Sequence, residues 1–313
     1  MDPTASYKTV KEQIAILKSK GMVFENEPKA EKLLDSNSYF SIINSYREPF
    51  AFPPNPKQFI RGTSFEEVHA LFFFDTRLRE KIFPTLLEAE ARLKNDIVNT
   101  FLGFQDSTGR RIYDNDAYLL LSSYDRSKPK LGLDVIANAH SLISKSLKQS
   151  AAISHYLTKY SYVPLWVLET RMTFGTLCHF YEALNTNVRQ AVAIKYQMTD
   201  KSLLTLIKIL TEGRNACAHK DRLYCIKHNY SMPTFNPSVY PLIHNAVLSG
   251  YGNNDLFSVL MGLRIVLGPK AMKPVVNWIK HELDELAKKL KTIPVSSIET
   301  KMGLSPSWAT DLL

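Results

Sequence analysis

The longest helical pattern in the chain runs from Ser64 to about Phe101, and it constrains the fold more than any other feature. Ser64 and Glu67 have the spacing of a capping box, in which each side chain satisfies the backbone N–H of the other residue. Apolar residues then recur at helical intervals, and Pro84 is expected to kink or divide the run. Because runs that alternate apolar and polar residues are scarce, the sequence predicts an all-α fold.

Local signals also predict how the chain is divided. Thr9 and Glu12 form a second capping-box pattern, so a helix is expected to begin directly after Thr9. Four prolines between Pro49 and Pro56 are expected to stop regular structure and to mark a boundary. We therefore predict an N-terminal helical module at 1–57, a main helical domain at 58–295 and a C-terminal segment at 296–313. A single helix is expected to follow Pro164 as far as about Leu184.

Composition narrows the class of protein. The 313 residues are 45% hydrophobic, which is enough for a sizeable core. No apolar stretch has the roughly 18 residues that a membrane-spanning helix needs, and no signal-peptide pattern opens the chain. With three cysteines, a cytoplasmic protein with reduced thiols and no membrane partner is expected. The net charge of +9 favours a polyanionic partner such as RNA.

Polar residues crowd the segment EGRNACAHKDRL, which follows the apolar run 203–210. On an ideal helix, Asn215, Ala218, His219 and Arg222 share one face. Arg214 lies about 140° from His219 around the same helix. The two side chains would therefore converge only if the helix ends here or if a second copy faces the first, which predicts a homodimer.

These residue types suit metal-free RNA cleavage. Histidine exchanges protons near neutral pH, arginine offers a fixed cationic fork to phosphate oxygens, and asparagine can orient either group. The alternative is structural, because Asn215 and His219 are also residue types that cap helix ends, and arginines extend along apolar surfaces. We weighed zinc binding by Cys217, His219, Cys225 and His228 and set it aside, because their spacing matches no usual zinc pattern. No metal and no cofactor are predicted.

Several blocks of the sequence resemble the Abi-like (AbiD/AbiF) abortive-infection proteins of bacteria, over nearly the whole chain. They are KTVKEQIAILKSKGM, NSYFSIINSYREPF, FDTRLREKIFPTLLEAEARLKNDI, PLWVLETRMTFGTLCHFYEAL, RNACAHKDRLY and KMGLSPSW. The segment from Arg214 to His219 also resembles the R-x4-6-H signature of the HEPN superfamily, with Asn215 in the usual polar second place.

The resemblance implies a HEPN-like helical bundle and a role in antiphage abortive infection or a toxin system. It further implies a metal-independent endoribonuclease with Arg214, Asn215 and His219 as catalytic residues. Arg222 matches the family's arginine beyond the motif, whereas Lys220 stands where many relatives have a second histidine. Because some proteins of this type occur with a small noncoding RNA, a non-cleaving module that binds a structured RNA is the alternative.

Further RNA contacts are predicted at Lys220, Arg222, Arg79, Tyr46 and Arg47. Arg79 can pair with Asp75 one helical turn away or point toward RNA. Tyr46 and Arg47 are of the types that bind unpaired bases, although local packing against the bundle is the favoured explanation for them.

Overall fold

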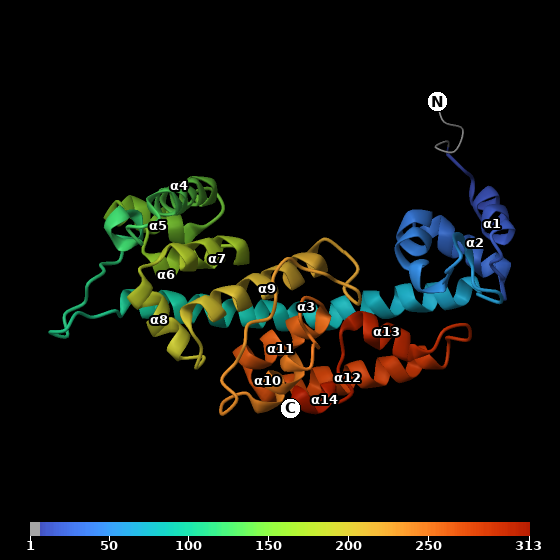
Figure 1. Ribbon diagram of the computed structural model, residues 1–313. Helices are drawn as coiled ribbons and strands as arrows, with labels where there is room; N and C mark the ends of the chain where they lie inside the picture. The colour runs from blue at the N-terminus through green and yellow to red at the C-terminus, as the bar shows by residue number, and fades with distance from the viewer. Residues whose placement is uncertain (1–6) are drawn as a thin grey trace.

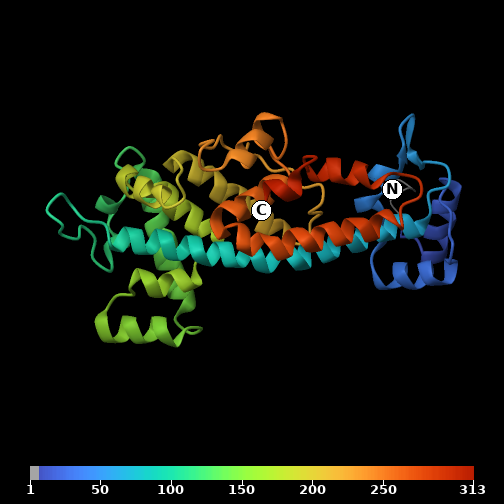
Figure 2. The same ribbon diagram turned by 90° about the horizontal axis from the view of Figure 1, so that it is seen from below.

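One long helix, α3 (Phe65–Leu102), organises the computed structural model, which describes residues 7–313. Its start has the predicted capping box: Ser64 Oγ accepts the N–H of Glu67, and the Glu67 carboxylate accepts the N–H of Ser64. The helix continues undivided through Pro84, whose side chain is exposed. Its 38 residues span about 57 Å, and α3 runs along the length of the molecule (Figures 1 and 2).

Short elements gather at the N-terminal end of α3, shown in blue in Figure 1. They are α1 (Val10–Ser19), α2 (Glu27–Ser36), the π-helix η2 (Phe40–Asn44), the 3-10 helix η3 (Glu48–Phe50) and the antiparallel strands β1 (Ala51–Phe52) and β2 (Asn55–Phe59). The predicted Thr9–Glu12 capping box is present at the start of α1. The strand pair corrects the expectation that the prolines stop regular structure here. In a two-stranded sheet both strands are edges, which tolerate prolines that lack an N–H.

A second group of elements surrounds the C-terminal end of α3, with α6, α7 and α8 in contact with it. In order they are η4 (Ala117–Leu119), η5 (Leu121–Ser123), α4 (Pro129–Ser146), α5 (Ala151–Tyr160), α6 (Leu165–Leu168), η6 (Glu169–Arg171), α7 (Phe174–Ala183) and α8 (Thr186–Ile194). The prediction of a single helix after Pro164 is wrong. Thr173 Oγ1 accepts the N–H of Thr176 at 3.2 Å and starts α7 as a separate helix, because a capping side chain replaces the helical bond.

The remaining helices form a third group, in which three helices contact α3 directly. They are α9 (Asp200–Ala218), α10 (Pro241–Leu248), α11 (Leu256–Leu267), α12 (Pro269–Ala287), α13 (Val295–Met302) and α14 (Trp308–Asp311). The helices α9, α11 and α12 all contact α3, and α9 also contacts α11. Two glycines bring α9 and α11 close together. A Cβ on Gly213 would lie 2.8 Å from Cγ1 of Val259, and one on Gly262 would lie 3.0 Å from Cδ2 of Leu210.

The predicted all-α class is confirmed, since helices dominate and the β1–β2 pair is the only sheet within residues 7–313. Nor does that part of the chain contain a helix of the length and apolarity needed to cross a bilayer. The division into 1–57, 58–295 and 296–313 stays a prediction.

Candidate functional site

The candidate site lies at the C-terminal end of α9, where that helix packs against the middle of α3. Arg214 reaches α3, and its Nε donates to Oε2 of Glu90 at 3.1 Å. Its Nη1 donates to Oδ1 of Asn215 at 3.0 Å. Glu90 is buried, and its other oxygen pairs with Nζ of Lys94 at 2.9 Å. The guanidinium of Arg214 therefore has a fixed orientation in a cluster of two cations and one carboxylate.

His219 occupies the end of α9 and faces solvent. Ala218 is the last helical residue, and the His219 N–H donates to the Asn215 carbonyl oxygen at 2.9 Å. Lys220 then takes a left-handed conformation with a φ of 60°, which is costly for a residue with a Cβ. Asp221 donates its N–H back to the carbonyl of Ala216 at 2.9 Å, which closes the helix end.

This helix end corrects the predicted common face. Arg222 lies beyond α9, so it cannot share a helical stripe with Asn215 and His219; its Nη1 instead donates to the Ser45 carbonyl at 2.8 Å. No hydrogen bond joins Arg214 to His219 in the described chain. Within one copy, the cation and the imidazole of the motif are separate.

A buried carboxylate on α3 fixes the segment that follows the motif. Asp75 is fully buried, and its Oδ1 accepts the backbone N–H of Tyr224 at 2.7 Å and that of Leu223 at 3.1 Å. Its Oδ2 accepts the hydroxyl of Tyr46 at 2.6 Å and an N–H of Arg79. One buried group thus joins the N-terminal elements, α3 and the segment after the motif, residues 220–224, here called the motif loop.

Arg79 and Tyr46 complete this arrangement. The Arg79–Asp75 ion pair confirms the one-turn pairing seen in the sequence, and Nη1 of Arg79 also donates to the Asp221 carbonyl at 3.1 Å. Burial, followed by the neighbouring Asp75 carboxylate, raises the pKa of Tyr46. The Tyr46 hydroxyl therefore stays protonated and donates.

A cleft of 790 Å³, here called the motif cleft, opens between the N-terminal elements and α3 beside this loop. Its walls hold four of the predicted RNA-binding residues: Tyr46, Arg79, Lys220 and Arg222. Lys220 and Arg222 are exposed, whereas Tyr46 and Arg79 are buried and bonded to Asp75. The fifth predicted residue, Arg47, does not line the motif cleft.

Arg47 contacts two residues of strand β2. Its Nη2 donates to the Pro56 carbonyl, and the guanidinium carbon lies 5.6 Å from the centroid of the Phe59 ring. This is the local packing that the sequence offered as the alternative to base binding.

Glu90 and Asp75 are the site residues that sequence reasoning did not assign to the motif. The Glu90–Lys94 pair has a local signal, the spacing of one helical turn. The contact between Glu90 and Arg214 spans 124 residues and has no local signal.

Glu169 has one buried carboxylate oxygen without a partner in the described chain, and burial raises its pKa despite the opposing effect of Lys94.

The histidine that follows the motif loop has a structural contact. His228 is buried, and its Nδ1 accepts the N–H of Tyr230 at 3.3 Å. Its Nε2 therefore carries the proton and donates to Oγ of Ser258 at 2.6 Å. No group of three or more His, Cys, Asp or Glu side chains within residues 7–313 is placed to hold a metal ion.

Fold and site together describe an all-α protein with an Arg-Asn-x3-His segment at the end of a packed helix. A family model described as Abi-like protein matches residues 32–225, which is more than half of the chain. The chain therefore belongs to the Abi-like family. Comparisons with curated proteins and with solved structures gave no match.

Proposed function

We propose that this Abi-like protein is a metal-independent endoribonuclease of the HEPN type, acting in abortive infection or a toxin system. Membership of the family suggests abortive infection. The observation that carries the enzymatic proposal is the arrangement of the motif side chains. Arg214 is held by Glu90 and Asn215, while His219, at the end of the same helix, is open to a substrate.

The proposed reaction is a transfer within the RNA backbone. The imidazole of His219 takes the proton of a 2′-hydroxyl, whose oxygen forms a bond to the adjacent phosphorus as the bond to the 5′-oxygen breaks. The proton then passes to the leaving 5′-oxygen, and the products are a 2′,3′-cyclic phosphate and a 5′-hydroxyl. Arg214 stabilises charge on the phosphoryl oxygens, and Asn215 fixes its orientation.

A homodimer would complete this site. In one copy Arg214 turns toward α3 and does not contact His219. We propose that Arg214 of one copy works with His219 of a second copy across the dimer axis. Lys220 and Arg222, exposed in the motif cleft, would contact RNA phosphates on either side.

The test is cleavage of a defined RNA in EDTA. His219→Ala is expected to lower the rate on the order of 100- to 10,000-fold. His140→Ala, an exposed histidine on α4, is the matched control and should leave the rate unchanged. Equal activity of wild type and His219→Ala, or loss of wild-type activity in EDTA, would overturn the mechanism.

Mixing variants tests the exchange between copies. A dimer of one Arg214→Ala chain and one His219→Ala chain retains one site in which both residues are intact. Cleavage should therefore reappear when the two inactive proteins are mixed. No recovery, or a monomer by light scattering at high micromolar protein with and without RNA, would contradict the two-copy site.

A second candidate function is a module that holds a structured noncoding RNA without cleaving it. The observation in its favour is that Arg214 and His219 do not meet in one copy, while the motif cleft presents Lys220 and Arg222. Sequencing the RNA that copurifies at low salt separates the two functions. One discrete intact species supports the binding module, and heterogeneous fragments or no RNA argue against it.

A further inference from the structure

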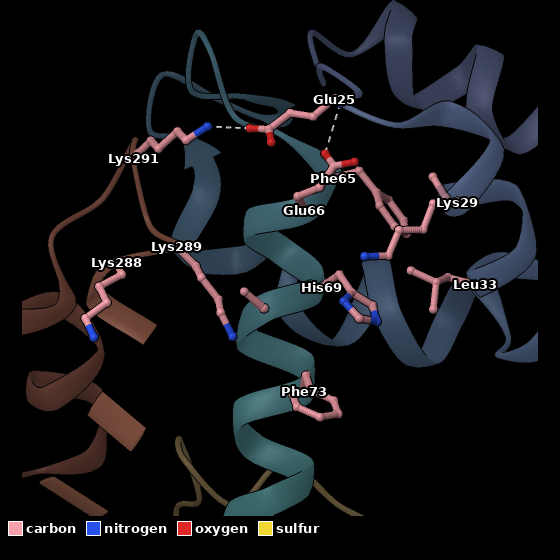
Figure 3. Close-up of a pocket in the computed structure, with 12 residues that line it drawn as sticks. Glu25, Lys29, Leu33, Phe65, Glu66, His69, Phe73, Lys288, Lys289 and Lys291 are labelled. Carbon is pink, nitrogen blue, oxygen red and sulfur yellow. Dashed lines mark hydrogen bonds and ion pairs between the residues drawn. The ribbon is translucent and has the colours of Figure 1, made fainter. Parts of the chain in front are cut away.

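A second cleft, of 440 Å³, lies at the N-terminal end of α3, between α2 and the residues that follow α12 (Figure 3). It shares no lining residue with the motif cleft. We call it the lysine cleft, after Lys29 on one side and Lys288, Lys289 and Lys291 on the other. Its volume is within the range of roughly 300–1,000 Å³ that is typical of small-ligand pockets.

Three rings on one face of α3 form the floor of the lysine cleft. Phe65, His69 and Phe73 follow one another at intervals of four residues. The Phe65 and His69 centroids are 6.1 Å apart with planes 20° apart, and those of His69 and Phe73 are 6.4 Å apart with planes 16° apart. Phe65 is 1% exposed and Phe73 is 46% exposed, so the series passes from the core to the surface. The exposed part offers a flat, apolar surface to a ligand.

Two cations face this surface without acidic partners. Lys29 extends from α2, and Lys289 extends from beyond the end of α12, toward His69 from opposite sides (Figure 3). Neither lysine forms an ion pair with a carboxylate in the described part of the chain. Burial, and then the charges of Lys29 and Lys289, lower the pKa of His69 against the opposing effect of Glu66. His69 therefore contributes a neutral ring at pH 7.

The carboxylates at the rim have other partners. Glu25 pairs with Lys291, and the Glu66 carboxylate accepts the backbone N–H groups of Glu25 and Asn26 at 3.2 and 3.0 Å. Neither carboxylate forms an ion pair with Lys29 or Lys289 in residues 7–313. The lysine cleft thus combines a flat apolar floor with two lysines, Lys29 and Lys289, that form no ion pair within the described residues.

We propose that the lysine cleft binds a nucleotide, with its base against His69 and Phe73 and its phosphate between Lys29 and Lys289. A ligand for this site must carry both a planar ring and negative charge. A peptide of Asp and Glu residues supplies only the charge, whereas each nucleotide unit supplies both. The proposal rests on the proposed RNA-directed function for the source of the nucleotide, a single strand of RNA, and it adds a contact site distinct from the motif.

Binding is measured in the His219→Ala background, so that cleavage cannot change the result. The probe is a fluorescein-labelled single-stranded RNA of ten nucleotides, followed by fluorescence anisotropy. Lys29→Ala with Lys289→Ala is expected to weaken binding at least tenfold and to reduce the salt slope by about 0.7, since the two lysines share one phosphate and each single-strand phosphate contact contributes about 0.7. Lys145→Ala with Lys148→Ala, two exposed lysines near the end of α4, removes the same charge and should change neither quantity.

The aromatic floor is tested separately. Phe73→Leu keeps an apolar side chain but removes the ring, and is expected to weaken binding roughly tenfold through loss of stacking. Adenosine 5′-monophosphate identifies the source. If it displaces the strand and depends on the same two lysines, the site takes free nucleotides as well; if only the strand binds, the site is specific to RNA.

Three results would overturn the proposal. The first is an equal loss of RNA binding in the Lys29/Lys289 and the Lys145/Lys148 double variants. The second is unchanged binding in Phe73→Leu, and the third is equal displacement of the RNA by a polyglutamate with the same charge as the RNA. Failure of the ribonuclease mechanism has a different signature, because His219→Ala would then leave cleavage unchanged while binding to the lysine cleft could still be measured.

Discussion

The backbone N–H of Tyr224 donates to Oδ1 of Asp75 at 2.7 Å, although the two residues are 149 positions apart. Leu223, Tyr46 and Arg79 direct further donors to the same carboxylate. A fully buried carboxylate is costly unless donors surround it, and this one has donors from three parts of the chain. The position of the loop after the motif therefore depends on a residue of α3.

Asp75→Asn is expected to lower the free energy of unfolding by about 3–5 kcal/mol, because the buried guanidinium of Arg79 loses its counter-charge. Urea unfolding measures the change. Adding Arg79→Met should recover part of the loss, and a double variant that loses the full sum of the two single effects would contradict this reason. Asp134→Asn, in the exposed pair with Lys130, is the control and should leave stability almost unchanged.

Glu90→Gln tests whether the ion pair with Arg214 positions the guanidinium for the proposed reaction. Because misplacement of a catalytic group is costly, kcat for RNA cleavage is expected to fall about 10- to 100-fold. Glu88→Gln removes an exposed carboxylate from the same helix and should retain wild-type kcat. If both variants cleave alike in single-turnover assays, the ion pair has no part in the reaction.

Gly213→Ala is expected to destabilise the protein, because its Cβ would lie 2.8 Å from Cγ1 of Val259. Overpacking of this kind costs about 1–3 kcal/mol, although the better helix propensity of alanine offsets about 1 kcal/mol. Thermal and urea unfolding of a double-mutant cycle with Val259→Ala measure the coupling. The double variant should lose less than the sum of the single losses, and simple additivity would show that α9 and α11 have room at this point.

The pH dependence of stability should reflect His228. Burial lowers the pKa of His228 to about 4, so between about pH 6.5 and 4 the unfolded chain binds a proton that the folded protein does not. Stability from this group is complete above pH 6.5 and falls as the pH drops toward 4, by at most about 3 kcal/mol. Urea unfolding of His228→Gln should have a flatter profile across this window, and parallel profiles would contradict the prediction.

Local signals in the sequence predicted local structure well. The capping boxes at Thr9 and Ser64 fixed the starts of α1 and α3, because their side-chain contacts are only three residues apart. The same reasoning failed after Pro164, where the capping side chain of Thr173 competes with an apolar pattern that runs on.

The site could be predicted in its residues but not in its contacts. The sequence motif identified Arg214, Asn215 and His219 as the candidate catalytic residues, and their catalytic role stays a prediction. What the sequence could not supply is the partner of Arg214, since Glu90 lies 124 residues away. Helical spacing also misplaced Arg222, because the chain leaves the helix through a left-handed turn at Lys220. Such a turn is usually indicated by a glycine in the sequence, and this position has none.

The bond between Asp75 and Tyr224 also sets an order in time. A ribosome adds about 5–20 residues per second, so the 149 residues between them take about 7–30 s to synthesise. During that interval α3 exists without the segment that its buried carboxylate must hold, and Val259, against which Gly213 packs, is made later still. A nascent chain therefore carries no assembled motif loop. The protein reaches its complete form only when most of the chain has been synthesised.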